Sequence, residues 1–491
     1  MSYSMFKSGT DIRGVASDVL GNEVNLTNEA VNDFACAFVC FLTDKLGISA
    51  EEMKISVGHD SRISANRISS VVIDALISSG VKVVDCGLSS TPAMFMTTVM
   101  LDCTAAIQIT ASHHPSDRNG LKFFLRSGGL GGNDISEILS LADSKTVYLS
   151  DKKGSCEKYN FMNDYSAMLR KIICDSVGKT EEELPLKNYH IIVDAGNGAG
   201  GFYAQDVLHK LGADISGSQF LEPDGMFPNH IPNPENEKAM NSIQEAVINS
   251  KADLGIIFDT DVDRAGCVDS NGVEINRNHL IALASAIVCQ ENPKSTIVTD
   301  SVTSDGLKTF IEEHLGCKHY RYKRGYKNVI DMAKQLCEQG INCPLAIETS
   351  GHAALKENYF LDDGAYLVTK IVIELAKGTD IDKLLQPLAV PAESVEYRFS
   401  ITEDNFKEYG QTVIDSLEKF VADKKEWKIA DDNREGIRVC VEDGWFLLRL
   451  SVHDPVMPIN IESNVSGGVE KTIAELRGFF AQFDKLKITA F

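Results

Sequence analysis

The sequence predicts an α/β protein: three tandem βαβ-type mixed-sheet domains, followed by a C-terminal α+β domain, around a central cleft. Three observations support this fold class. The chain has 491 residues, which suggests three or four domains at about 150 residues per domain. A strand–helix–strand pattern occurs three times along the chain, and the C-terminal part follows a different order of elements.

Each of the three repeated segments joins an apolar strand to an amphipathic helix. The strands are expected at residues 55–58, 190–193 and 296–298. Each helix carries apolar residues three and four positions apart, which is typical of a helix with one buried face. A glycine suited to a left-handed cap follows each helix; these glycines are Gly80, Gly212 and Gly316. Such units build parallel or mixed sheets that helices cover, so we expect three similar domains.

The elements after residue 389 have no βαβ alternation, which predicts a separate α+β domain. We expect strands at 394–401, 436–441, 445–450 and 460–463, and helices at 405–421 and 469–483. The predicted domains span residues 1–155, 156–275, 276–388 and 389–491.

Composition and charge exclude several classes of protein. Apolar residues make up 43% and charged residues 24% of the chain, which is typical of a globular protein and excludes a disordered or fibrous one. The net charge of −22 disfavours nucleic acid and anionic lipid as partners. No apolar run approaches the roughly 20 residues of a transmembrane helix. The 12 cysteines contain no Cys-x-x-Cys pair, so we expect reduced thiols and a cytoplasmic protein.

Four polar loops each follow an apolar strand. In open α/β sheets ligands bind beyond the carboxyl ends of the strands, so we expect these loops to meet at one cleft. The loops span residues 111–115, 259–264, 348–352 and 449–455.

The loop with the sharpest pattern has three carboxylates at alternate positions, on Asp259, Asp261 and Asp263. Three neighbouring carboxylates repel one another unless a cation lies between them, and hard oxygen ligands suit Mg²⁺ or Ca²⁺. An EF-hand is excluded because Arg264 and Ser270 stand where that loop needs Gly and Glu. Arg264 suggests that the site also binds an anion. The alternative is a solvated acidic turn.

A candidate nucleophile, Ser112, is followed by His113 and His114, with Lys122 further along the chain. A serine nucleophile needs a base or an electrophile to activate it, and adjacent residues rarely face each other. The chain has no Gly-x-Ser-x-Gly elbow, which argues against an ordinary serine hydrolase. A polar surface turn is the alternative.

The glycine-rich segment 196–201 matches Gly-x-Gly-x-x-Gly between a strand and a helix, with Glu222 about 20 residues further on. This pattern is the best argument for a dehydrogenase. The competing interpretation is that these glycines only let the chain turn tightly and the helix pack on the strand.

Two further segments have a polar or basic composition. Four basic residues alternate with tyrosines; they are Arg321, Lys323, Arg324 and Lys327. In so acidic a chain they suggest a phosphate-attracting loop, with a nucleic-acid patch or a solvated face as alternatives. Glu348, Ser350 and His352 carry groups suited to sugar hydroxyls, although an ordinary polar turn would look the same.

In combination, these segments resemble the α-D-phosphohexomutase superfamily, and specifically its bacterial phosphomannomutase/phosphoglucomutase branch. The resemblance covers nearly the whole chain, in order. It rests on residues 10–14, 110–115 with 119–122, 193–201, 259–264, 325–327 and 348–352. There are two departures: His114 stands where Asn is commoner, and the last loop, Arg-x-Ser-Gly-Thr-Glu-Pro in the family, has Val452-His453 in place of Gly-Thr.

The resemblance implies an enzyme that interconverts hexose 1-phosphates and hexose 6-phosphates of mannose, glucose or both. Ser112 would carry a phosphoryl group, and a hexose 1,6-bisphosphate would be both intermediate and activator. One Mg²⁺ ion would bind to Asp259, Asp261, Asp263 and Ser112. The remaining roles follow from the same resemblance: Arg13, Lys122 and His113 at the reacting end, Glu348, Ser350 and His352 on the sugar hydroxyls, and Arg264, Lys327, Arg449, Ser451 and His453 on substrate and phosphate.

Two alternatives to this function stay open on the sequence. A phosphoglucosamine mutase has the same Glu-x-Ser-Gly-His loop, and the altered last loop is compatible with a catalytically silent sugar-phosphate-binding protein. The expected partners are small sugar phosphates, without nucleic acid or membrane, and the chain is expected to be a monomer or a homodimer.

Overall fold

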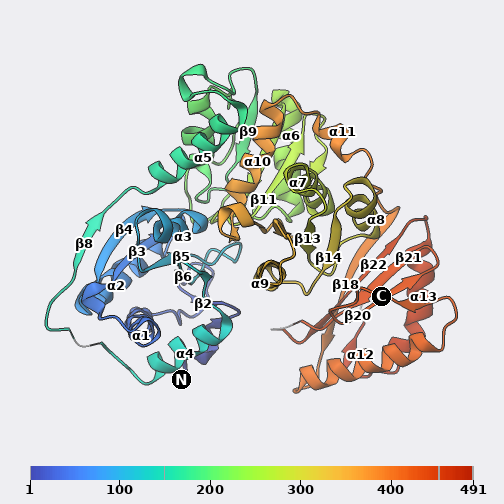
Figure 1. Cartoon of the computed structure of the whole chain (residues 1–491). Coiled ribbons are helices and arrows are strands. Elements are labelled where there is room, and N and C mark those ends of the chain that lie inside the picture. The colour runs from blue at the N-terminus through green and yellow to red at the C-terminus, as the bar shows by residue number, and fades with distance from the viewer. Residues whose placement is uncertain (1, 149, 452–453, 489–490) are drawn as a thin grey trace. The chain divides into compact units, whose positions relative to one another are not determined.

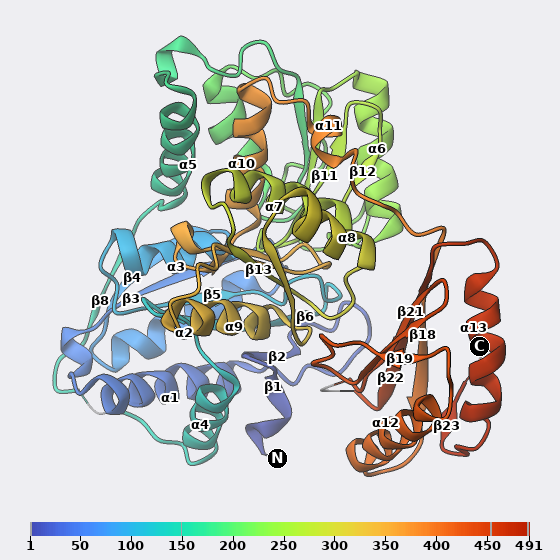
Figure 2. The same cartoon turned by 45° about the vertical axis from the view of Figure 1, so that its right-hand side comes forward.

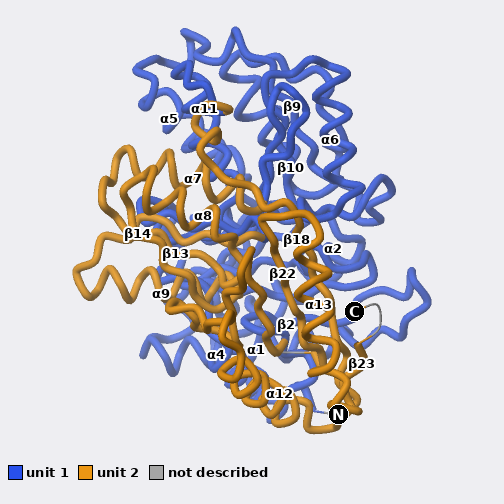
Figure 3. The backbone as a smooth tube through the Cα atoms, turned by 90° about the vertical axis from the view of Figure 1, so that its right-hand side faces the viewer, with its two compact units in different colours: residues 1–276, 350–381 blue, residues 277–349, 382–491 orange. Residues whose placement is uncertain are grey.

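The computed structural model describes residues 2–148, 150–451, 454–488 and 491. The chain forms two compact units (Figure 3): the first unit contains residues 1–276 and 350–381, and the second unit contains residues 277–349 and 382–491. The division between the units falls inside the predicted third domain. The four domain boundaries therefore stay a prediction.

The first unit begins with an eight-stranded sheet in the order β1-β2-β6-β5-β3-β4-β8, with β7 beside β6 (Figure 1). β3 pairs in parallel with β4 and β5, and β4 with β8, whereas β6 pairs antiparallel with β2 and β5. The predicted mixed sheet is confirmed. The strands are β1 (Lys7–Ser8), β2 (Asp11–Val15), β3 (Lys54–His59), β4 (Lys82–Leu88), β5 (Ala105–Ile109), β6 (Arg118–Leu125), β7 (Gly128–Gly129) and β8 (Ser155–Lys158).

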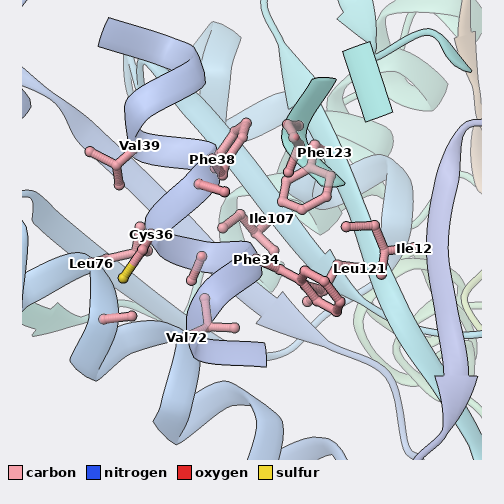
Figure 4. Close-up of a cluster of buried hydrophobic side chains, with 14 of the residues drawn as sticks. Ile12, Phe34, Cys36, Phe38, Val39, Val72, Leu76, Ile107, Leu121 and Phe123 are labelled. Carbon is pink, nitrogen blue, oxygen red and sulfur yellow. The ribbon is translucent and has the colours of Figure 1, made fainter. Parts of the chain in front are cut away.

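Helices cover both faces of this sheet. Three of them, α1 (Asn28–Leu46), α2 (Ala65–Ser78) and α4 (Gly132–Asp143), lie on one face, and α3 (Thr91–Met100) packs on the other (Figure 1). Phe34 and Phe38 of α1 meet Ile107 and Phe123 of the sheet in a buried core (Figure 4). This packing orients the strand ends from which the polar loops emerge.

The glycines expected to end helices adopt the predicted left-handed conformation, because Gly80, Gly212 and Gly316 all have positive φ. Two helices differ from the prediction: residues Tyr203–Leu208 and Phe310–His314 form π-helical turns. Apolar spacing specifies which side of a helix is buried, but it does not distinguish hydrogen bonding to the fourth residue from hydrogen bonding to the fifth.

A second sheet of the first unit has the order β12-β11-β10-β9. β9 and β10 pair in parallel and the remaining pairs are antiparallel. The strands are β9 (Ile191–Asp194), β10 (Leu254–Phe258), β11 (Ala265–Asp269) and β12 (Glu274–Ile275). The helices α6 (Glu237–Ser250) and α10 (Gly364–Ala376) pack on them, and α5 (Met162–Val177) packs on α10.

Residues 350–381 belong to the first unit because buried contacts bind them there. Their hairpin is β16 (Ala353–Leu355) with β17 (Leu361–Asp362), and it precedes α10. The hydroxyl of Tyr165 in α5 donates to Asp363, the N-cap of α10, at 2.7 Å, and the hydroxyls of Tyr203 and Thr369 are 2.8 Å apart. Helix packing thus joins this segment to a part of the chain far away in sequence.

The second unit contains a parallel sheet and an antiparallel sheet. β13 (Thr296–Thr299) pairs in parallel with β14 (Lys318–Arg321) and β15 (Leu345–Ile347). The helices of this region are α7 (Arg277–Glu291), α8 (Asp305–Thr309) and α9 (Tyr326–Glu338).

The predicted C-terminal α+β region is confirmed as an antiparallel sheet in the order β19-β20-β21-β22-β18-β23, with α12 and α13 packed on it (Figure 2). The elements are β18 (Glu393–Ile401), α12 (Phe406–Ala422), β19 (Lys428–Ile429), β20 (Ile437–Val441), β21 (Gly444–Leu448), β22 (Val456–Ser463), α13 (Gly468–Phe480) and β23 (Leu486–Lys487), preceded by α11 (Ile381–Leu385). Phe446 and Leu448 join the core under the helices. Trp445 and Leu447 alternate with them along β21, so their side chains lie on the opposite face of the sheet, where they pack with Val302.

Two global properties follow from the described residues. Each of the 12 cysteines is a free thiol. Within the described ranges, no helix combines the length and the apolar character that crossing a membrane requires.

Candidate active site

Ser112 lies in a buried loop that follows β5, and it has an unusual backbone. Its φ is +49°, in the left-handed region that residues with a Cβ seldom adopt. The backbone N–H of Ser112 donates to Thr110 Oγ1 at 2.9 Å, and Arg62 donates to its carbonyl oxygen at 2.5 Å. Neighbouring groups therefore bind both sides of the strained residue.

The hydroxyl of Ser112 contacts the aspartate loop, 147 residues further along the chain. Ser112 Oγ donates to Asp259 Oδ2 at 3.1 Å and accepts from Arg264 Nη2 at 3.1 Å. Ser112 is 4% exposed and Arg264 is 2% exposed. A polar surface turn is therefore the wrong interpretation of this serine, because its hydroxyl is enclosed by charged side chains.

His113 also lies beside Ser112, but its ring nitrogen has another partner. Nδ1 of His113 is 3.2 Å from Ser112 Oγ and accepts from Arg264 Nη2 at 2.5 Å. Burial and the charge of Arg264 lower the pKa of His113 to about 2. The imidazole is consequently neutral, and the nitrogen nearest the serine already accepts a hydrogen bond.

The three aspartates follow β10 and are fully buried, which excludes a solvated acidic turn. One carboxylate oxygen from each of Asp259, Asp261 and Asp263 lies within 4.8 Å of the others. Lys122 Nζ is 2.5 Å from Asp263 Oδ2 and 3.4 Å from Asp261 Oδ2. Thr91 Oγ1 donates to Asp261 Oδ2 at 2.5 Å; no sequence motif pointed to this threonine.

Charge is unevenly compensated within the aspartate triad. Burial raises the pKa of Asp259 well above its usual value, and repulsion from Asp263 and Asp261 raises this pKa further. Burial would also raise the pKa of Asp263, but Lys122, His352 and Arg264 lower it below its usual value. The site therefore retains unfavourable negative charge beside Asp259.

The triad could hold a metal ion. Asp261 Oδ1 and Asp263 Oδ1 are buried, and no described residue gives either of them a hydrogen bond. Buried carboxylate oxygens normally have partners, and a hard divalent cation would supply one to both. The donor set of three carboxylates matches such an ion.

The other predicted residues of the first unit lie close to this centre. Arg13 forms an ion pair with Asp11 at 2.7 Å and donates to the carbonyl of Ala111 at 2.9 Å, next to Ser112. His352 Nδ1 hydrogen-bonds Asp362 and lies 4.0 Å from Asp263 Oδ1.

The charge of His352 depends on these carboxylates. Burial would lower the pKa of His352, but Asp362 and Asp263 raise it to about 9. Ser350 is buried in the same loop, 8% exposed.

The remaining predicted residues belong to the second unit. Glu348 is buried, and its Oε1 accepts from the backbone N–H of Gly325 at 2.6 Å. Lys327 pairs with Asp331 at 2.9 Å, one turn along α9. The hydrogen bond from Gly325 to Glu348 thus connects the Gly325-Tyr326-Lys327 motif to the first residue of the Glu-x-Ser-x-His motif.

Arg449 has the features of an anion-binding residue. It is 8% exposed, and its Nε has no hydrogen-bond partner within the part of the chain that the structure describes. Burial and the nearby charge of Arg324 lower the pKa of Arg449. Ser451 Oγ accepts from the N–H of Asp454 at 3.3 Å. His453, the other predicted phosphate ligand of this loop, lies outside the described residues.

One residue of the basic segment, Arg321, has a structural role. Arg321 is buried and pairs with Asp432 at 2.7 Å and Asp305 at 2.8 Å, so a solvated face is the wrong interpretation for this residue. Its charge is compensated inside the protein by these two carboxylates.

The glycine-rich segment serves close packing. A Cβ at Gly198 would lie 2.5 Å from the carbonyl oxygen of Thr260, and a Cβ at Gly201 would lie 2.3 Å from that of Leu221. Both distances are far too short, so the packing interpretation is confirmed and the pattern offers no support for a dehydrogenase.

The comparisons with known proteins match most of the chain. Family models described as phosphoglucomutase/phosphomannomutase alpha/beta/alpha domains I, II and III match residues 7–148, 163–272 and 276–390. The chain belongs to the phosphoglucomutase/phosphomannomutase family. It is therefore an enzyme, a phosphohexomutase that interconverts hexose 1-phosphates and hexose 6-phosphates.

Relatives of this family resemble the chain over most of its length. A phosphoglucomutase of Neisseria gonorrhoeae is 28% identical, with 94% of this chain and 93% of the relative covered. A phosphomannomutase/phosphoglucomutase of Pseudomonas syringae pv. tomato is also 28% identical, with 94% and 92% covered. The crystal structure of a phosphoglucomutase/phosphomannomutase family protein from Burkholderia thailandensis has a TM-score of 0.80 at 26% identity and covers 98% of both chains.

Sequence reasoning missed several residues that contact this centre: Asp60, Arg62, Thr91 and Asp362. Asp60 and Arg62 directly follow β3, in the same position relative to a strand as the loops that were singled out. That position was the available signal. Thr91 and Asp362 gave none, because their contacts are made only in the folded protein.

Proposed function

We propose that Ser112 is the phosphoryl carrier of this phosphohexomutase. The observation that carries the proposal is the contact of Ser112 Oγ with Asp259 and Arg264 in a buried, left-handed loop. A phosphoserine there would place its oxygens beside the Arg264 guanidinium, which binds phosphate through paired donors.

The transfer requires one bond to form as another breaks. A free hydroxyl of the hexose phosphate attacks the phosphorus, the bond from phosphorus to Ser112 Oγ breaks, and a bisphosphorylated sugar results. The hydroxyl proton passes to a base, and the other phosphate of the bisphosphate later returns to Ser112. A hexose 1,6-bisphosphate would thus also activate enzyme that has lost its phosphate.

We propose Mg²⁺ as the resident ion, with Asp259, Asp261, Asp263 and an oxygen of phosphorylated Ser112 as ligands. When bound, such an ion neutralises developing charge on the transferring phosphoryl group. The chain's own cations do related work: Lys122 and Arg264 bind the carboxylates now, and both carry donors that a phosphoryl oxygen can accept from.

His113 would position Arg264 instead of taking the proton of Ser112. Its Nδ1 accepts from Arg264, so it has no lone pair left for the serine. The protonated His352, the guanidinium of Arg13 and Lys122 would supply donors at the reacting end, because each already contacts a carboxylate or a carbonyl there.

The sugar and its second phosphate would bind through residues of two loops. Glu348, Ser350 and His352 offer acceptors and a donor for hydroxyls, and Arg449 with Ser451 would bind the phosphate that does not react. The buried Nε of Arg449, which has no hydrogen-bond partner among the described residues, supports this role, because an anion would supply one.

A substrate panel tests the proposal. Glucose, mannose and glucosamine phosphates are each supplied with Mg²⁺ and a trace of the matching bisphosphate. We expect turnover of glucose and mannose phosphates. Much faster turnover of glucosamine 6-phosphate would replace this proposal with a phosphoglucosamine mutase, and no turnover of any would favour a silent binding protein.

A further inference from the structure

We propose that Arg62, together with Asp60, is a positioning pair that sets the Ser112 loop for phosphoryl transfer. The inference rests on the proposed role of Ser112 as the phosphoryl carrier. Neither residue touches the hydroxyl of Ser112 in the described contacts, so the pair acts through the backbone.

Arg62 donates hydrogen bonds to four backbone carbonyl oxygens between residues 112 and 118. Its Nη1 donates to Pro115 at 2.7 Å and to Arg118 at 2.8 Å, and its Nη2 donates to Ser112 at 2.5 Å and to His114 at 2.6 Å. Arg62 is 2% exposed. A planar guanidinium has donors in fixed directions, so four acceptors on one side chain hold the loop in one shape.

Asp60 acts on the other side of Ser112. Its Oδ2 accepts from Thr110 Oγ1 at 2.7 Å, and Thr110 Oγ1 in turn accepts from the backbone N–H of Ser112 at 2.9 Å. Asp60 Oδ1 accepts from the N–H of Arg62 at 2.9 Å, and Asp60 Oδ2 lies 3.4 Å from Arg62 Nε. The N–H and the C=O of the candidate nucleophile are therefore connected to the same buried pair.

The backbone of Ser112 explains why the loop needs such a pair. A left-handed conformation is unfavourable for a residue with a Cβ, so a loop without these hydrogen bonds would relax toward negative φ. That relaxation would rotate Oγ away from Asp259 and Arg264. Because a displacement of about 1 Å can reduce a rate about 100-fold, the orientation of Ser112 should depend on the pair.

The test compares Arg62→Lys, Arg62→Ala and Asp60→Asn in the full-length enzyme, with Arg67→Met as the control. Arg67 also donates to backbone carbonyls, of Ala16 at 2.9 Å and of Leu26 at 3.1 Å, but none of its described contacts involves residues 112–118. For each variant, kcat and KM for glucose 1-phosphate are measured, together with the share of phosphate that the phosphoenzyme loses to water instead of transferring to glucose 1-phosphate. Circular dichroism and thermal unfolding check that each variant is folded.

We expect kcat of Arg62→Lys and Asp60→Asn to fall about 100-fold with KM little changed, because substrate is bound by other residues. The share of phosphate lost to water should rise, since a misaligned phosphoserine reacts less with the sugar. Added guanidinium ion at low concentration should restore part of kcat in Arg62→Ala. Arg67→Met should keep the wild-type values of all three quantities.

A merely structural role predicts different results: lower thermal stability, with wild-type kcat and phosphate partition in the folded fraction. That result in Arg62→Lys would overturn the inference. If the Arg62 variants do not fold, Asp60→Asn decides, and wild-type kinetics in that variant would overturn it. A wild-type enzyme without phosphoserine or mutase turnover would overturn the proposed function and this inference together, whereas a normal wild type with unaffected variants would overturn this inference alone.

Discussion

Arg264 Nη2 donates a hydrogen bond to Nδ1 of His113 at 2.5 Å. The same nitrogen of Arg264 donates to Ser112 Oγ at 3.1 Å, so one guanidinium orients both the imidazole and the hydroxyl beside it. This contact separates His113 from the role of base that a Ser-His pair suggests in the sequence.

The first prediction concerns His113. His113→Gln retains an oxygen that can accept from Arg264 and should keep most of kcat. His113→Ala removes one of the acceptors of Arg264 Nη2; a hydrogen bond to a charged group is worth about 1.5–3 kcal/mol, so kcat should fall tenfold or more, as about 1.4 kcal/mol is a factor of ten. Steady-state kinetics of both variants checks the difference. Equal, severe losses would instead mean that the imidazole itself transfers a proton.

The phosphoryl carrier can be tested by mass. Purified wild-type enzyme should contain a partial phosphate adduct on the peptide with Ser112, and Ser112→Ala should lack both the adduct and mutase turnover. Ser144→Ala, at an exposed serine of the same unit, should retain both. Substantial turnover by Ser112→Ala would remove this residue from the reaction.

Metal binding should be visible without turnover. Titrating Mg²⁺ into chelator-treated enzyme should raise its thermal stability, by about 2.7 kcal/mol at a concentration one hundred times Kd. Asp261→Asn removes one charge from the buried triad and should abolish most of this increase and most of the activity. Full activity after exhaustive chelation would contradict the metal site.

Arg449, which we propose as part of a phosphate clamp that binds the non-reacting phosphate, should affect substrate binding. Arg449→Ala removes a buried guanidinium whose charged hydrogen bonds are worth about 1.5–3 kcal/mol each, so KM should rise tenfold or more. Phosphorylation of Ser112 should be unchanged, which intact-mass analysis can check. Arg449→Lys keeps the charge without the paired donors and should lie between the two. Unchanged kinetic constants in Arg449→Ala would exclude a clamp at this position.

A buried histidine of the second unit should make stability depend on pH. Burial and nearby Arg321 hold the pKa of His319 well below 6.5, and its Nε2 hydrogen-bonds Thr299 at 2.7 Å. The folded protein therefore keeps His319 neutral, while the unfolded chain takes up a proton below about pH 6.5.

The contribution of His319 to the free energy of unfolding is therefore fully present above about pH 6.5. Below that value, this contribution falls by about 1.4 kcal/mol per pH unit. Urea unfolding at pH 5.5 and pH 7 measures the difference for wild type and His319→Gln. The difference in the free energy of unfolding between pH 7 and pH 5.5 should be smaller in His319→Gln, because the variant lacks the one proton that His319 takes up on unfolding. An identical difference in both proteins would show that His319 does not remain neutral in the folded state.

The element types were predictable from the sequence, because apolar spacing and terminal glycines are local properties. The sequence also placed the polar loops after the strands, and the alternate spacing of Asp259, Asp261 and Asp263 indicated a cation site. These features depend on residues a few positions apart, whose geometry follows from the periods of helix and strand.

Which side chains contact one another depends on long-range packing, which the sequence patterns did not predict. Ser112 Oγ contacts Asp259, and Lys122 contacts Asp263, because packing of two sheets in one unit brings together residues more than 130 positions apart. The left-handed φ of Ser112 and the four carbonyls on Arg62 leave no local pattern in the sequence, because they result from contacts with buried partners. Residues 350–381 joined the first unit for the same reason: the hydrogen bond from Tyr165 to Asp363 and the packing of α10 on α5 are long-range contacts that no local propensity specifies.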